Sequence, residues 1–118
     1  MQKIAIVILS DTGSDEALGR IFNALTAAKE YKEAGDQVNV TFTGTGTKWI
    51  AALHQTNHPA HGLYQAVKDK VAGACGFCAG AYGQTDAAAA SGVPLLKDYG
   101  DNMSFRKLTA AGYQVVTF

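Results

Sequence analysis

Two cysteines, Cys75 and Cys78, stand in a C-x-x-C spacing within the stretch GACGFCAGAYG, and the chain has no others. This spacing occurs in redox pairs and metal sites, but either cysteine can also act alone as a nucleophile or pack as a small buried side chain. The apolar run VAGACGF predicts a strand over 71–77. Because side chains alternate along a strand, a strand that continues through Cys78 directs the two thiols to opposite faces and prevents a disulfide between them.

Cys78 is the stronger candidate for a reactive thiol. The small residues that follow it predict a helix over 79–91. The N-terminus of such a helix favours a thiolate and lowers the thiol pKa from about 8.5 toward neutrality. A thiolate there is a nucleophile that can accept sulfur and pass it on. Cys75 lies one strand step inward and is expected to be its buried companion.

The helices and strands that must position the cysteines are predicted from apolar patterns and from the residues that commonly begin or end a helix. Strands are predicted over 4–9, 36–42, 71–77, 93–95 and 113–118, and helices over 16–34, 79–91 and 103–111, with short helices opened by Thr47 and by Pro59. Glycine follows three of the predicted helices, in EAG, ASG and AAG, where a helix commonly ends. The alternation predicts a single domain over 1–118, of the α/β class, with three layers α/β/α around a five-stranded, mostly parallel sheet.

Ligands of open parallel sheets bind beside the carboxyl ends of the strands. Four loops gather there: SDTGSD at 10–15, TGTGTK at 43–48, CAGAYG at 78–83 and KDYGD at 97–101. The loop TGTGTK either holds a small anion on its backbone N–H groups or is a plain turn into a helix, and its spacing differs from the known nucleotide fingerprints. The candidate ligand-binding residues are Asp11, Gly44, Thr45, Gly46, Thr47, Lys48 and Tyr82.

Composition argues against several classes of function. Ten Lys and Arg residues balance ten Asp and Glu residues without a basic block, so nucleic acid is not an expected partner. The apolar run 4–9 is too short for a membrane span and lacks the pattern of a signal peptide, which predicts a cytoplasmic protein with reduced thiols. Pro59 interrupts the helix on which His54 and His58 would share a face, and no metal site or cofactor is expected.

Seven stretches are informative when taken together: IAIVILSDT, KEAGD, TGTGTKW, HGL, GACGFCAGAYG, GVPLL and GYQVVTF. With them the chain resembles the DsrE-like superfamily over nearly its whole length, and TGTGTKW, HGL and FCAGAYG are the most specific. It implies a five-stranded parallel sheet flanked by helices, and assembly as a homotrimer or homohexamer. It also implies a persulfide on one cysteine after the third strand, used in sulfur relay for tRNA thiolation or in sulfur oxidation.

When the resemblance is applied residue by residue, it implies that the persulfide forms on Cys78, which precedes the helix start AGA. Cys75 is implied to resolve or shield that persulfide, although the relay proteins do not require it. The segment after Cys78 departs from the relay members, in which it is shorter and differently charged. The leading hypothesis is therefore a sulfur carrier that serves donor and acceptor proteins. The alternatives are a non-catalytic oligomeric module that binds a small anion or metabolite, and a dithiol oxidoreductase, which the strand geometry disfavours.

Overall fold

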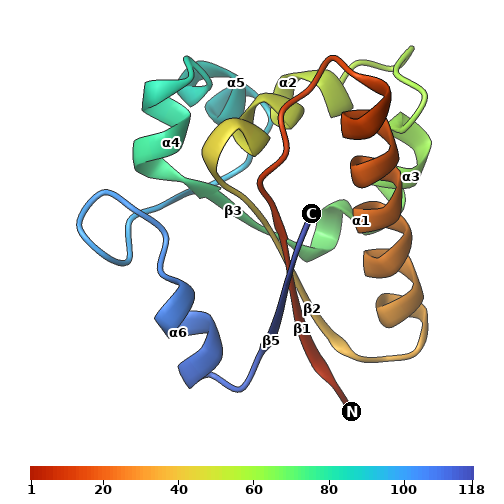
Figure 1. The fold of residues 1–118 in the computed structure, drawn as a ribbon, viewed down its shortest axis with the longest axis vertical. Helices are drawn as coiled ribbons and strands as arrows, with labels where there is room; N and C mark the ends of the chain where they lie inside the picture. The colour runs from red at the N-terminus through yellow and green to blue at the C-terminus, as the bar shows by residue number, and fades with distance from the viewer.

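The computed structural model describes residues 1–118, which fold around one five-stranded sheet (Figure 1). The strands are β1 (Lys3–Ile8), β2 (Gln37–Phe42), β3 (Val71–Cys75), β4 (Leu95–Leu96) and β5 (Gln114–Thr117). The helices are α1 (Asp15–Glu33), α2 (Trp49–Leu53), α3 (His61–Val67), α4 (Gly76–Ala81), α5 (Thr85–Ala90) and α6 (Phe105–Ala110), with 3-10 helices η1 (Gly44–Lys48) and η2 (Lys68–Lys70). All pairs of strands are parallel, so the predicted α/β class is confirmed.

The strand order β4-β3-β2-β1-β5 places the first strand beside the last. In the register of the sheet, Ile4 pairs with Val38 on one side and with Gln114 on the other. Strand β1 is buried from Ile4 through Ile8, as its continuous apolar sequence predicted for a parallel strand covered on both faces.

Helices cover the two faces of the sheet unequally. On one face, α1, α2 and α3 contribute to a main core of 19 buried residues. On the other face, α6 packs against the sheet and lies to the left of the strands in Figure 1, below α4. The core on that side is a small cluster made of Ala5, Val7, Cys75, Met103 and Leu108. The three predicted layers are present, and Cys75 belongs to the thinner side.

The predicted junctions between helices and strands are confirmed where glycine ends a helix. Gly35, before β2, adopts the left-handed conformation with φ of +83°, and Gly92 and Gly112 do the same before β4 and β5. The start of α1 is fixed by Ser14, whose Oγ accepts a hydrogen bond from the Ala17 N–H at 3.0 Å.

The short helices after β2 begin differently from the prediction. Thr47 does not cap a helix, because its hydroxyl donates to the Gly44 carbonyl at 2.9 Å inside η1. Helix α2 then starts at Trp49 without a side-chain cap. Pro59 does not open α3 directly, since the helix begins two residues later at His61.

Two elements near the end of the chain are also shorter than predicted. The helix expected over 103–111 begins at Phe105, because Ser104 Oγ accepts the Lys107 N–H at 3.0 Å and caps it there. The strand expected over 93–95 is displaced to Leu95–Leu96, which pair with Ala74 and Cys75 of β3. None of the helices combines the length and apolar character that crossing a membrane requires.

Strand β3 ends at Cys75, two residues before its predicted end. The chain turns into α4 at Gly76, where a Cβ atom would lie 2.9 Å from Lys97 Cγ and 3.0 Å from the Asp101 carbonyl oxygen. Phe77 is consequently a helical residue with a side chain 58% exposed, and its N–H donates to the Asp101 carbonyl at 2.7 Å. The loop after β4 therefore fixes the place where the strand becomes a helix.

The single helix predicted over 79–91 is divided into α4 and α5. Between them the chain turns at Gly83, whose φ of +69° is outside the helical region. Helix α4 has only six residues, with Cys75 at its N-cap position and Cys78 in its first turn.

Candidate functional site

The early turn into α4 brings the two cysteines to the same side of the chain. Side chains three residues apart at the start of a helix are neighbours, whereas the predicted strand would have separated them. The Thr43 hydroxyl lies 3.6 Å from Cys78 Sγ and also acts on the pKa of Cys75, so both sulfurs face one hydroxyl group. Both cysteines are free thiols in this structure. The prediction that they point to opposite faces is therefore wrong.

Cys75 is buried, with 1% of its surface exposed. Its thiol donates to Asn102 Oδ1 across 3.6 Å. Burial acts to raise the pKa of Cys75, but the backbone N–H groups of Cys78 and Met103, together with the side chains of Cys78 and Thr43, outweigh it and hold the pKa below its ordinary value. The hydrogen-bond donors around Cys75 thus lower its pKa although the sulfur is enclosed.

Cys78 is the accessible member of the pair, because it is half-buried rather than enclosed. Its backbone carbonyl accepts the Tyr82 N–H at 3.0 Å, which closes the short helix α4. The prediction of a long helix whose dipole acts on Cys78 does not hold, since α4 ends at Ala81. Individual hydroxyl and N–H groups, rather than a long helix, form the surroundings of the two sulfurs.

The order of the strands explains where these groups come from. β3 lies between β2 and β4 in the sheet. Thr43 follows the end of β2, and Asn102 and Met103 belong to the segment after β4. The two strands that flank β3 therefore supply the groups that contact its terminal cysteine and the first turn of α4.

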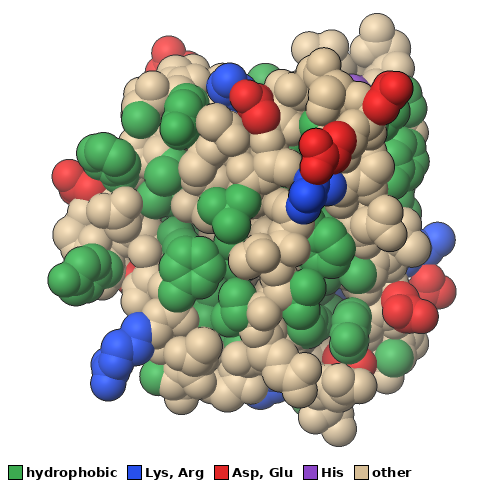
Figure 2. All heavy atoms as spheres, viewed as in Figure 1, with side chains coloured by type: hydrophobic (Ala, Val, Ile, Leu, Met, Phe, Trp, Pro, Cys, Tyr) green, Lys and Arg blue, Asp and Glu red, His purple; other side chains and the backbone are tan.

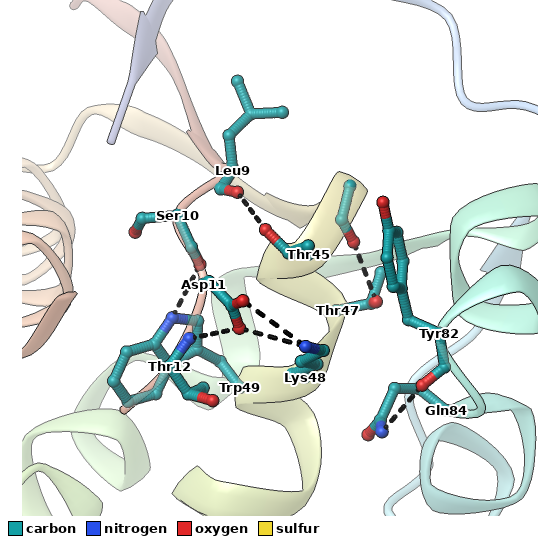
Figure 3. A network of polar contacts seen from close by, with 11 residues as sticks. Leu9, Ser10, Asp11, Thr12, Thr45, Thr47, Lys48, Trp49, Tyr82 and Gln84 are labelled. Carbon is teal, nitrogen blue, oxygen red and sulfur yellow. Dashed lines mark hydrogen bonds and ion pairs between the residues drawn. The ribbon is translucent and has the colours of Figure 1, made fainter. Parts of the chain in front are cut away.

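Three of the predicted ligand-binding residues meet beside this site, at the end of β1 (Figure 3). Lys48 Nζ lies 3.3 Å from Asp11 Oδ1 and 5.7 Å from the centre of the Tyr82 ring. The backbone N–H of Thr12 and then Lys48 lower the pKa of the Asp11 carboxyl. The predicted grouping of Asp11, Lys48 and Tyr82 at one edge of the sheet is thus observed, with the lysine between the other two.

The loop TGTGTK directs its polar groups inward. The Thr45 hydroxyl donates to the Leu9 carbonyl at 3.1 Å, and the Gly46 N–H donates to the Thr43 carbonyl at 2.9 Å. Gly46 and Thr47 are buried, and the Thr47 hydroxyl is bonded within η1. Together these contacts attach the end of β2 to the end of β1. Lys48 is the predicted ligand-binding residue of this loop that carries a charge at the surface.

An open cleft of about 410 Å³ lies at the carboxyl ends of β1 and β5. Its polar lining includes Ser10, Asp11, Ser14 and Arg20, and Arg20 is paired with Glu16 at 3.0 Å. Neither cysteine lines this cleft. The carboxyl edge of the sheet therefore carries two separate features, a thiol pair at β3 and a polar cleft at β1.

The three histidines bond to nearby backbone. Nδ1 of His54 lies 2.6 Å from the Ile50 carbonyl oxygen, and Nδ1 of His61 lies 2.7 Å from that of Leu53. His58 Nδ1 accepts an N–H from the backbone at 3.0 Å. No three His, Cys, Asp or Glu side chains converge as ligands of a metal ion.

Comparison with known proteins places the chain in a family. Residues 2–118 match the model of the DsrE/DsrF-like family. The chain belongs to the DsrE/DsrF-like family. This DsrE/DsrF-like chain is 26% identical over 115 residues to the uncharacterized protein MJ0733 of Methanocaldococcus jannaschii, covering 97% of this chain and 93% of that protein.

Two solved structures share the fold of this DsrE/DsrF-like protein. The ychN protein from E. coli superposes with a TM-score of 0.65 at 19% identity, with 100% of each chain covered. The conserved protein of unknown function BT1422 from Bacteroides thetaiotaomicron superposes with a TM-score of 0.64 at 13% identity, covering 97% of this chain and 94% of that one. The expected DsrE-like fold is confirmed.

Sequence reasoning missed three neighbours of the sulfurs in this DsrE/DsrF-like protein: Thr43, Asn102 and Met103. Thr43 was included in a loop at the carboxyl edge, but not as a partner of a cysteine. Asn102 and Met103 directly follow the predicted loop 97–101. Knowledge that β3 lies between β2 and β4 would have identified all three, and the strand order is not contained in the local pattern.

Proposed function

We propose that this protein carries sulfane sulfur as a persulfide on Cys78 and transfers it to a thiol of a partner protein, in the cytoplasm. Membership of the DsrE/DsrF-like family supports a role in sulfur relay. The observation that carries the proposal is the difference in access between the two thiols. Cys78 is half-buried at the carboxyl edge of the sheet, whereas Cys75 is enclosed, so a donor protein can reach only the former.

The proposed transfer is an exchange between thiols and persulfides. The Cys78 thiolate attacks the outer sulfur of a donor persulfide, a bond forms between Cys78 Sγ and that sulfur, and the donor leaves as a thiolate. In the second step an acceptor thiolate attacks the same outer sulfur, and Cys78 leaves as a thiolate. Atoms and electrons balance in both steps without an added oxidant.

The proposal predicts that sulfur uptake depends on Cys78. After incubation with a cysteine desulfurase and cysteine, the Cys75→Ala protein is expected to gain the mass of one sulfur atom, and Cys78→Ser is expected to gain none. Intact-protein mass spectrometry before and after treatment with a reductant measures this gain. Uptake by Cys78→Ser equal to that of Cys75→Ala would contradict the assignment to Cys78.

The proposal includes self-association as a homotrimer or homohexamer. Several large apolar side chains are exposed at the surface, namely Phe77, Tyr99, Phe105 and Val116. Figure 2 shows hydrophobic side chains at the surface of the face that carries β5 and α6, with few charged groups among them. Subunit contacts would remove such side chains from water.

The polar cleft at β1 and β5 favours a second candidate function, the binding of a small polar metabolite. Asp11 and Glu16 line it together with Arg20, so two carboxylates face one guanidinium and a simple anion is a poor match. A ligand bound there is expected to raise the midpoint of thermal unfolding, and the rise should be the same in Cys78→Ser because the cleft contains neither cysteine. Thermal-shift screening of polar metabolites against both proteins measures it, and a rise abolished by Cys78→Ser would contradict this function.

A further inference from the structure

Cys75 is a buried nucleophile that the proposed carrier function does not use as a carrier. It packs among Ala5, Val7, Met103 and Leu108, where a protein donor cannot approach it. Its sulfur is nevertheless directed toward the first turn of α4, which contains Cys78. The enclosed thiol therefore has one accessible reaction partner, the neighbouring cysteine.

We propose that Cys75 attacks the loaded Cys78, forms an intramolecular disulfide and releases the carried sulfur as hydrosulfide. The inference rests on the proposed persulfide at Cys78 and adds a second fate for it. A loaded protein that meets no acceptor discharges itself instead of keeping a reactive persulfide. The disulfide then requires a dithiol reductant, such as a thioredoxin-type protein, to restore the two thiols.

The step balances within the protein. The Cys75 thiolate attacks Cys78 Sγ, the bond between the two protein sulfurs forms, and the bond from Cys78 Sγ to the outer sulfur breaks. The outer sulfur leaves with its electron pair and its proton as hydrosulfide. Two cysteine sulfurs are oxidised to the disulfide and the sulfane sulfur is reduced, so no external oxidant takes part.

The backbone allows this disulfide where the predicted strand would not. The start of α4 places Cys75 at the N-cap and Cys78 in the first turn, on one side of the chain. A disulfide needs their Cβ atoms about 3.5–4.5 Å apart, so closure requires a small movement of this first turn as well as rotation of the side chains. The Thr43 hydroxyl, 3.6 Å from Cys78 Sγ, also interacts with Cys75, which places both sulfurs on one side of α4.

The groups around Cys75 favour the attacking form of its thiol. Although burial opposes charge, the N–H groups of Cys78 and Met103 point toward the sulfur and hold its pKa below the ordinary value. These donors belong to the backbone of α4 and of the segment after β4, so they are present whether or not Cys78 is loaded. When Cys75 is neutral, its thiol donates a hydrogen bond to Asn102 Oδ1.

The test loads wild type, Cys75→Ala and Cys75→Ser with a cysteine desulfurase and cysteine, removes the donor, and follows mass and released sulfide with time. Wild type is expected to lose its added sulfur, to release one sulfide per chain and to finish two hydrogens lighter than the reduced protein. The Cys75 variants should keep the added sulfur. Since intramolecular attack has a high effective concentration, we expect loss from wild type to be roughly tenfold faster or more. Two variants are used because alanine suits the apolar cluster, whereas serine retains a hydroxyl.

A second arm tests the attack without any persulfide. The aromatic disulfide 5,5'-dithiobis(2-nitrobenzoate) first forms a mixed disulfide with the accessible Cys78. In wild type, Cys75 is expected to displace the second nitrothiobenzoate, so that two are released and none stays bound, whereas Cys75→Ala should release one and keep one. Retention of the adduct by wild type would overturn the inference.

The outcomes separate the two proposals. If wild type keeps its persulfide as long as Cys75→Ala does, the inference fails and the carrier function stands. If neither Cys75 variant takes up sulfur, the carrier function fails together with the discharge step. In that case closure by the aromatic disulfide would identify the pair as a dithiol oxidoreductase instead.

Discussion

Replacing Gly46 with alanine is expected to destabilise the fold by about 3 kcal/mol or more, the largest effect of any single methyl group added to this protein. An alanine Cβ at this position would lie 2.1 Å from the carbonyl oxygen of Ile8 and 2.6 Å from its carbonyl carbon. That carbonyl cannot turn aside freely, because it accepts the Thr43 N–H at 3.0 Å. The midpoint of urea unfolding, followed by circular dichroism, measures the loss.

Gly19→Ala is the matched control for this substitution. Gly19 lies inside α1, and nothing would lie within 4 Å of its added Cβ. Alanine is the better helix former, so this variant is expected to gain about 0.5–1 kcal/mol. A Gly46→Ala protein as stable as wild type would show that η1 does not approach β1 as closely as described, and would reopen the interpretation of TGTGTK as an anion-binding loop.

Removing the hydroxyl of Tyr64 is expected to stabilise the protein, and to stabilise it most at high pH. The side chain is fully buried and its hydroxyl has no hydrogen-bond partner. Burial raises the pKa of Tyr64 to about 12. In the unfolded chain a tyrosine ionises near pH 10, so between about pH 10 and 12 unfolding releases a proton and the folded state loses stability as pH rises.

The Tyr64→Phe protein keeps the edge-on ring contacts with Phe42 and His54 and loses only the unpaired hydroxyl. We expect an unfolding free energy about 1 kcal/mol higher than that of wild type at neutral pH, and a further gain of roughly 2 kcal/mol approaching pH 12. Urea unfolding at a series of pH values measures both. Tyr99→Phe, at a side chain 77% exposed, should change neither quantity. Equal alkaline unfolding of wild type and Tyr64→Phe would mean that the Tyr64 hydroxyl reaches solvent.

The local sequence predicted those elements whose cause is local. The apolar run of β1 was sufficient to predict that strand, because a strand buried on both faces needs continuous apolar side chains. The glycine at position 35 was sufficient to predict the end of α1, because a helix often ends with a residue in the left-handed conformation. The grouping of Asp11, Lys48 and Tyr82 followed from one general rule on the carboxyl ends of parallel strands.

The cysteine pair was misplaced because its position depends on distant residues. The strand pattern through Phe77 is equally compatible with a longer β3, and what ends that strand is Lys97 and Asp101, which cross close to Gly76. The prediction for Cys78 rested on a single helix over 79–91, which the structure divides at Gly83. The N–H groups that lower the pKa act on Cys75, and one of them comes from Met103, which reaches the site through the strand order.

That strand order also has a consequence for how the chain is made. β1 pairs with β2 on one side and with β5, over a hundred residues later, on the other. Until residues 114–117 have left the ribosome, one edge of the apolar segment IAIVI lacks its partner and can pair with another nascent chain. The protein is therefore expected to fold slowly for its size and to need dilution or a chaperone during synthesis.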